Sequence, residues 1–158
     1  MSSRRTHVDL SVQTAFPPSY RAAVSRAARA AADAVSKTAW KSMRGASPRA
    51  SVTVSIVGKA ASRKLNRRFR GKDKPTDVLS FPSATVPGSD FVGDVIVCWP
   101  VALEQTEAFD TTPKQEAQRL VVHGVLHLFG YDHETSQADA RRMFRLQNQV
   151  LRKLFTRG

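Results

Sequence analysis

Three histidines in the segment HGVLHLFGYDH form the group of side chains best placed for chemistry in this chain. His123 and His127 are four positions apart, so on a helix their imidazoles share one face and can approach the same ion. Gly130 can end that helix and turn the chain, which brings His133 back toward the pair. Three neutral imidazoles leave the fourth tetrahedral position of a zinc ion open for water. The spacing therefore predicts a catalytic site for a single Zn2+ ion, with His123, His127 and His133 as its ligands.

The residue after His123 bears on which bond such a site would hydrolyse. The spacing matches the metzincin protease pattern H-E-x-x-H-x-x-G-x-x-H, whose glutamate is the general base for peptide hydrolysis. Here Gly124 stands at that position, and a glycine cannot take a proton from water. Asp132, beside His133, could orient an imidazole or cap the turn. A zinc peptidase with an unusual base and a zinc-dependent hydrolase of phosphodiesters are both compatible with these residues.

The formal net charge of +12, with a pI near 10.9, is the strongest feature of the composition. Such a field attracts polyanions and adds salt-dependent affinity for phosphate backbones, although a basic surface can also serve solubility alone. A peptide groove gains nothing obvious from this charge, so it favours RNA or DNA as the partner. Between residues 59 and 74 the basic side chains face only Asp73, which predicts an RNA-binding stripe or else a solvated helix face. The basic stripe consists of Lys59, Arg63, Lys64, Arg67, Arg68, Arg70, Lys72 and Lys74.

Length and composition indicate one domain spanning residues 1–158, with residues 1–5 as a flexible tail. The lone Cys98 can form no internal disulfide, which fits a reducing compartment. The sequence has no run of about 18 apolar residues and no apolar stretch typical of a secretory signal. We therefore expect a cytoplasmic protein without a membrane partner.

Apolar periodicity and turn residues predict an α+β fold. Strands are expected over 6–14, 51–57, 77–81 and 91–98, and helices over 17–43, 59–69, 100–109, 112–128 and 136–155. Thr111 or Thr112 should cap the helix that carries the first two histidines, with Glu116 reaching back to the cap. That helix is too apolar to lie on the surface. The expected fold is a small mixed sheet of about four strands, packed with about five helices around a central helix that carries the HxxxH metal motif.

Three blocks of sequence resemble the YbeY endoribonucleases, also called rRNA maturation factors. The blocks are LNRRFRGKDKPTDVLSFP from Leu65 to Pro82, VGDVIV from Val92 to Val97, and the histidine segment with the downstream Met143. They lie in the family's order and spacing, and the likeness extends from about Ser51 to the end of the last expected helix. The first fifty residues match the family only as a strand followed by a helix.

The resemblance implies a metal-dependent endoribonuclease specific for single-stranded RNA. It implies a role in maturing the 3′ end of small-subunit ribosomal RNA and in ribosome quality control, with the ribosome or a small-subunit precursor as partner. His123, His127 and His133 match the family's zinc ligands, and Arg70 matches its functional arginine. We therefore take Arg70 and His123 as candidate catalytic residues, and we expect Ser80 and Phe81 to line the cleft.

Independently of the resemblance, the guanidinium of Arg70 could grip phosphate oxygens and offset the charge that develops during phosphodiester cleavage. The nucleophile could be an activated water or the 2′-OH of the RNA itself. A second hypothesis, supported by the missing glutamate and the basic surface, is a non-catalytic RNA-binding or ribosome assembly factor whose zinc is structural. Three imidazoles also accept nickel, cobalt or copper.

Overall fold

The computed structural model describes residues 9–35, 49–84 and 89–156. Its strands are β1 (Asp9–Thr14), β2 (Arg49–Val57), β3 (Val78–Pro82) and β4 (Phe91–Cys98). Its helices are α1 (Pro18–Ala34), α3 (Lys59–Arg70), α4 (Trp99–Ala108), α5 (Pro113–Leu128) and α6 (Gln137–Thr156). These elements confirm the predicted α+β fold class. No helix in the described ranges is both long and apolar enough to cross a membrane.

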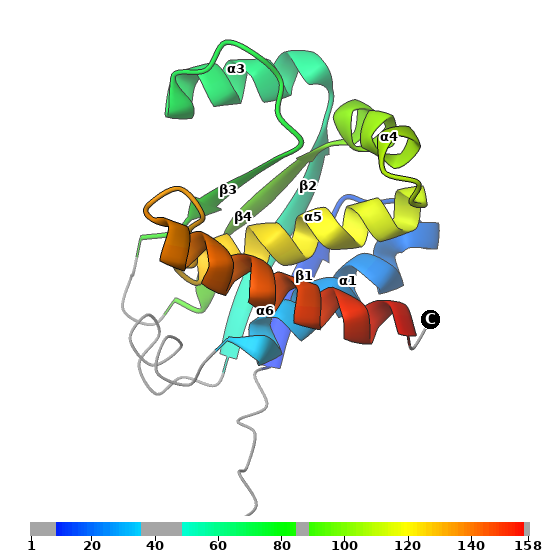
Figure 1. The fold of residues 1–158 in the computed structure, drawn as a ribbon, viewed down its shortest axis with the longest axis vertical. Coiled ribbons are helices and arrows are strands. Elements are labelled where there is room, and N and C mark those ends of the chain that lie inside the picture. The colour runs from blue at the N-terminus through cyan, green and yellow to red at the C-terminus, as the bar shows by residue number, and fades with distance from the viewer. Residues whose placement is uncertain (1–8, 36–48, 85–88, 157–158) are drawn as a thin grey trace, which may run out of the picture.

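The four strands form one mixed sheet in the order β1-β2-β4-β3. The pairs β1–β2 and β2–β4 are parallel, whereas β3 runs antiparallel to β4. Alternation along β2 turns Ala50, Val52 and Val54 into the core. Helices α1, α5 and α6 pack against one another and cover one face of this sheet (Figure 1). Helix α3 lies beyond one end of the strands, away from that helical layer (Figure 1).

Helix α5 is the buried centre of the molecule, as its apolar sequence predicts. Its side chains at Leu120, Val121 and Val125 are almost inaccessible to solvent. Thr112 is the N-cap, and it exchanges reciprocal hydrogen bonds with Gln115. The predicted capping role of Glu116 is therefore wrong. A capping box needs the third helical residue, and with Pro113 at the first position that residue is Gln115.

Helix α1 ends at Ala34, before the predicted end near residue 43. Val35 takes an extended conformation with ψ of 136°, and its N–H donates to the carbonyl oxygen of Ala32. Helix α1 ends here because Val35 has an extended backbone conformation and cannot continue it. The remaining predicted helical residues, 36–43, lie outside the described ranges, as do the expected tail and the first residues of the first predicted strand.

Gly124 allows α5 to approach the sheet closely. A Cβ at this position would lie 2.6 Å from Cγ1 of Val95 and 3.1 Å from Oγ of Ser80. The hydroxyl of Ser80 also donates to the carbonyl oxygen of Gly124, at 3.0 Å. A glutamate side chain at position 124 would run into β4, so the protease-type base has no room in this fold.

The substitution Gly124→Ala should lower the free energy of unfolding by up to about 2 kcal/mol. Overpacking a core costs about 1–3 kcal/mol, and the roughly 1 kcal/mol by which a helix favours alanine offsets only part of it. Urea unfolding would measure the change. Gly58→Ala is the control, since a Cβ at Gly58 would meet nothing within 4 Å. A Gly124→Ala protein more stable than the parent by about 1 kcal/mol, as helix propensity alone predicts, would contradict this account of the packing.

Candidate metal centre

The three predicted histidines meet at a cleft of about 770 Å³. Its walls come from the end of α3, from β3 and α5, from the loop that follows α5, and from α6. Two guanidinium groups, those of Arg70 and Arg119, line the same cleft. Segments that are far apart in the sequence therefore supply its chemistry.

His123 and His127 project from α5, and His133 returns toward them after the helix has ended. The turn passes through Gly130, whose φ of 92° lies in the region that favours glycine. One nitrogen atom from each imidazole lies within 4.8 Å of the corresponding atoms of the other two. The ring centroids are 4.7 to 5.2 Å apart. The predicted convergence is confirmed, and the three side chains could hold a metal ion.

Partial burial keeps the two helical imidazoles neutral. Burial is the main cause that lowers the pKa of His123 from 6.5 to about 4, against the opposing effect of a hydrogen bond to Gln147. The pKa of His127 is also lowered, first by burial and then by the nearby His133. A neutral imidazole carries the lone pair that a metal ion binds. At neutral pH both rings are therefore in the form that can act as ligands.

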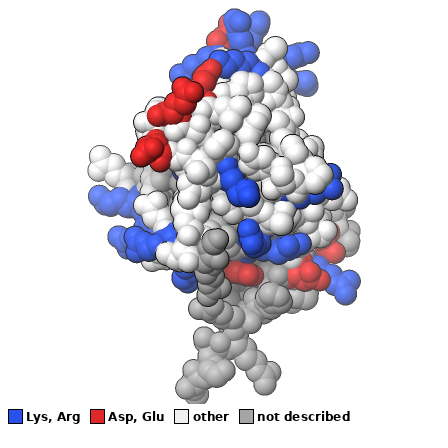
Figure 2. All heavy atoms as spheres, turned by 90° about the vertical axis from the view of Figure 1, so that its right-hand side faces the viewer, with Lys and Arg blue, Asp and Glu red and all other residues white. Residues whose placement is uncertain are grey.

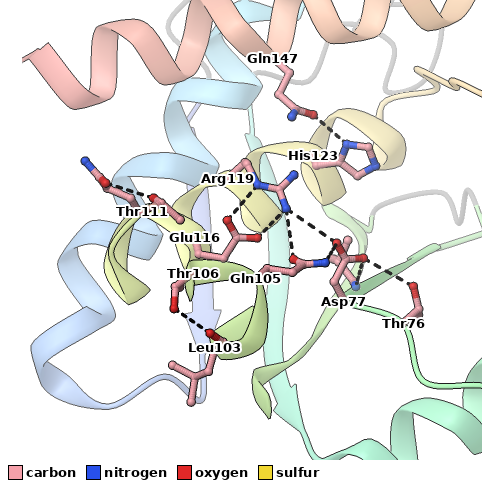
Figure 3. A network of polar contacts seen from close by, with 12 residues as sticks. Thr76, Asp77, Leu103, Gln105, Thr106, Thr111, Glu116, Arg119, His123 and Gln147 are labelled. Carbon is pink, nitrogen blue, oxygen red and sulfur yellow. Dashed lines mark hydrogen bonds and ion pairs between the residues drawn. The ribbon is translucent and has the colours of Figure 1, made fainter. Parts of the chain in front are cut away.

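Gln147 of α6 orients His123. Its Oε1 lies 2.7 Å from Nδ1 of His123, and the glutamine is 4% exposed (Figure 3). When the Nδ1–H donates to this oxygen, the free lone pair of the ring is on Nε2. Sequence reasoning missed Gln147. The sequence does contain an indication of its role, because Gln147 is a polar residue among the apolar positions of α6 that are buried, between Met143 and Val150.

His133 supplies a test of whether the site fits a cation. Its Nδ1 is buried and has no hydrogen-bond partner among the described residues. A buried polar atom without a partner costs free energy, and a cation bound at this nitrogen would satisfy it. The three imidazoles are a donor set that zinc accepts. The residues present therefore fit a metal ion.

Arg70 reaches the cleft from the end of α3, where Gly71 turns the chain in a left-handed conformation. Its Nη2 lies 2.5 Å from Oε1 of Glu134, on the loop that carries His133. This contact holds the pKa of the Glu134 carboxyl below its usual range. Glu134 is exposed, so the ion pair contributes little stability, and Arg70 can exchange this partner for the oxygens of a phosphate.

The basic stripe lies on α3 and the loop that follows it, and all eight of its residues are exposed. Figure 2 shows Lys and Arg gathered at the top of the molecule, the end at which α3 lies in Figure 1. Three members of the stripe have acidic partners, in the ion pairs Lys59–Glu104, Arg63–Asp73 and Arg70–Glu134. Among the described residues that line the cleft, Arg70 is the stripe's one member. The stripe thus leads away from the histidines along α3, and its role in RNA binding stays a prediction.

Arg119, the second guanidinium of the cleft, lies one helical turn before His123 and was not predicted. Its Nε and Nη2 donate to the two carboxylate oxygens of Glu116, at 3.0 and 2.5 Å (Figure 3). Nη2 also donates to Oε1 of Gln105, at 3.3 Å, and lies 3.8 Å from Oδ2 of Asp77. The contact with Glu116 raises the pKa of Arg119, so a fixed positive charge stands in the wall of the cleft.

The remaining residues considered from the sequence have identifiable places. Oδ1 of Asp132 accepts a hydrogen bond from the N–H of Glu134 at 2.8 Å, which is the turn-capping geometry. Ser80 and Phe81 line the cleft from β3, as predicted. Asp132 therefore shapes the loop of His133 through its backbone.

Comparisons with known proteins point in one direction. The family model described as "Endoribonuclease YbeY" matches residues 19–155. An endoribonuclease YbeY from Sulfurihydrogenibium sp. is 46% identical over 105 residues, which are 65% of this chain and 69% of the relative. One from Persephonella marina is 40% identical over 112 residues, 67% of this chain and 73% of the relative. The solution structure of TM1509 from Thermotoga maritima is similar with a TM-score of 0.55 and 27% identity, covering 94% of this chain and 90% of that one.

The metal-free protein should lose stability as the pH falls from about 6.5 toward about 4. In the unfolded chain His123 takes up a proton at its ordinary pKa of 6.5, whereas in the folded protein its pKa is about 4. Between these two pH values the unfolded chain binds more protons, so a falling pH favours unfolding. This group lowers the free energy of unfolding by up to about 1.4 kcal/mol per pH unit. Urea unfolding at several pH values should show a shallower dependence for His123→Gln. Equal slopes for the two proteins would show that His123 is not the group responsible.

Proposed function

Because this chain belongs to the family of YbeY endoribonucleases, we propose that it is a zinc-dependent endoribonuclease specific for single-stranded RNA. We further propose that it acts as one domain in the cytoplasm, where it matures the 3′ end of small-subunit ribosomal RNA and contributes to ribosome quality control. Its partner would be the ribosome or a small-subunit precursor. The observation that carries the proposal is that three converging imidazoles and the guanidinium group of Arg70 line one cleft.

In this proposal, different residues of the chain would bind the metal ion, bind the RNA strand and stabilise the negative charge that develops on the phosphate. His123, His127 and His133 would hold the zinc ion, with Gln147 setting the tautomer of His123. When bound, the ion would polarise the scissile phosphate or lower the pKa of a water molecule. Arg70 would exchange Glu134 for phosphate oxygens and offset charge that develops on them. The basic stripe would guide the strand toward the cleft through contacts with its backbone.

Two nucleophiles are compatible with this arrangement, an activated water and the RNA's own 2′-OH. The chemistry of the product ends separates them. Attack by the 2′-OH leaves a 2′,3′-cyclic phosphate, whereas attack by water leaves an acyclic phosphate. Mass spectrometry of the cleaved ends would therefore identify the nucleophile, and a cyclic end would exclude the version with water.

The variants Arg70→Ala and His123→Ala should both cleave single-stranded RNA far more slowly than the parent. Loss of one charge-stabilising donor costs about 100- to 1,000-fold in kcat, and we expect Arg70→Ala to fall in this range. Removal of the metal with a chelator should abolish cleavage by the parent. The assay is cleavage of a defined ribosomal RNA 3′ end by purified protein.

Arg145→Ala is a suitable control, because Arg145 is an exposed arginine outside the lining of the cleft. If Arg70→Ala and His123→Ala cleave as fast as the parent, the observed nuclease is a contaminant or the assigned site is wrong. If the parent is inactive but binds ribosomes tightly, a non-catalytic assembly factor with a structural zinc is the better description. Zinc-dependent cleavage of casein would instead revive the peptidase hypothesis.

The variant Gln147→Leu should bind zinc about 10- to 100-fold more weakly, since outer partners of metal-ligating histidines typically contribute this much affinity. The measurement is competition for zinc with a chromophoric chelator, which needs no RNA. Gln149→Leu is the matched control on the same helix, because Gln149 is exposed. Equal zinc affinity in the parent and in Gln147→Leu would show that Gln147 does not contribute to metal binding.

A further inference from the structure

Two exposed phenylalanine rings line the same cleft as the histidines. The exposed large hydrophobic residues of the described ranges are Phe69, Leu103, Phe109, Phe144 and Phe155. Of these, Phe69 and Phe144 lie on the cleft. Scattered apolar side chains on a surface need no explanation. Two aromatic rings on the walls of the cleft that Arg70 lines do, because they offer flat apolar faces beside a guanidinium group that can bind phosphate.

Phe69 is held in place while much of its ring stays accessible. The side chain is 56% exposed, and Phe81 contacts it in a T-shaped arrangement with ring centroids 4.9 Å apart. The guanidinium carbon of Arg68 lies 5.3 Å from the centroid of the Phe69 ring. The next residue in the chain is Arg70, which also lines the cleft. The end of α3 therefore presents an aromatic ring and cationic groups together.

Phe144 stands on another wall of the cleft. It is 41% exposed, and its ring centroid lies 6.2 Å from that of His123 and 5.7 Å from that of His133. It comes from α6, and α5 lies between α6 and α3 in Figure 1. The histidine cluster is thus bordered by aromatic rings from two different helices.

We propose that Phe69 and Phe144 are stacking sites for unpaired nucleobases of an RNA strand whose phosphate is held at Arg70. The proposal rests on the proposed function and adds the groups that recognise the bases. Every base has a π face that stacks on aromatic side chains and on guanidinium planes, whereas the basic stripe contributes only contacts to phosphate. Bases inside a duplex have their faces covered by neighbouring bases. These rings would therefore favour single-stranded RNA over duplex RNA without reading its sequence.

The test measures binding by the metal-free full-length protein, so that it does not depend on the zinc site. Fluorescence anisotropy would compare a single-stranded RNA with an RNA of equal length whose central nucleotides lack their bases. The variants are Phe69→Leu and Phe144→Leu, which keep an apolar side chain but remove the π face, and Phe69→Trp, which restores one. Phe109→Leu is the matched control, because Phe109 is 70% exposed and lies off the cleft.

Each stacked base should strengthen binding about 5- to 150-fold, so with two stacking sites the parent should prefer the complete RNA over the RNA without central bases by the product of two such factors. Phe69→Leu and Phe144→Leu should each lose one such factor, while Phe69→Trp and Phe109→Leu should keep the parent's ratio. The salt dependence of binding should stay unchanged, because the contacts to phosphate are intact. If both leucine variants keep the parent's ratio, the stacking sites are refuted and the proposed nuclease function still stands. A parent that binds no RNA in this assay, and that cleaves none when loaded with zinc, would refute both.

Discussion

The contact between α5 and β4 at Gly124 determines the rotation of α5, and with it the direction in which His123 and His127 project. With no side chain at this position, the helix backbone lies directly against Val95 and Ser80. Each residue of an α-helix is rotated by about 100° from the one before it, so a helix held at one point has all its faces assigned. His123 and His127 are then carried to the side that opens on the cleft. The glycine that removes the protease-type base is the same residue that orients the histidines.

Burial separates the roles of the two guanidinium groups. Glu116, the partner of Arg119, is almost fully buried, so a break in this pair would leave an unpaired charge inside the protein. Glu134, the partner of Arg70, is exposed, and water can solvate its carboxylate when the pair opens. Arg119 is therefore a fixed part of the wall, whereas Arg70 is free to change partners. An incoming phosphate therefore competes with one exposed carboxylate for Arg70, while the pair of Arg119 and Glu116 stays in place.

The sequence predicts those parts of the site that depend on local geometry. The spacing of His123 and His127 on a helix, followed by Gly130, was enough to predict that His133 returns to them, because helix periodicity and a glycine turn act over a few residues. Gln147 was missed because its contact with His123 depends on how α6 packs against α5. The capping role of Glu116 was wrong because the cap needs the third helical residue, which is Gln115. Its actual partner, Arg119, lies three residues further along the same helix, at a spacing that helix periodicity does predict. Packing between helices decides the contact of Gln147, and the periodicity of one helix does not reveal it.

The carboxylates of the cleft argue for RNA over peptide as the substrate. Peptide hydrolysis by a zinc enzyme needs a carboxylate that is free to take a proton from water. As long as no phosphate has displaced it, Glu134 pairs with Arg70, while Asp132 accepts the N–H of Glu134 and Asp77 accepts the N–H of Val78. Cleavage of RNA depends instead on stabilising negative charge around phosphorus, and the strand carries a nucleophile in its 2′-OH. Arg70 can supply part of that stabilisation, so these residues suit the cleavage of a phosphodiester better than the hydrolysis of a peptide.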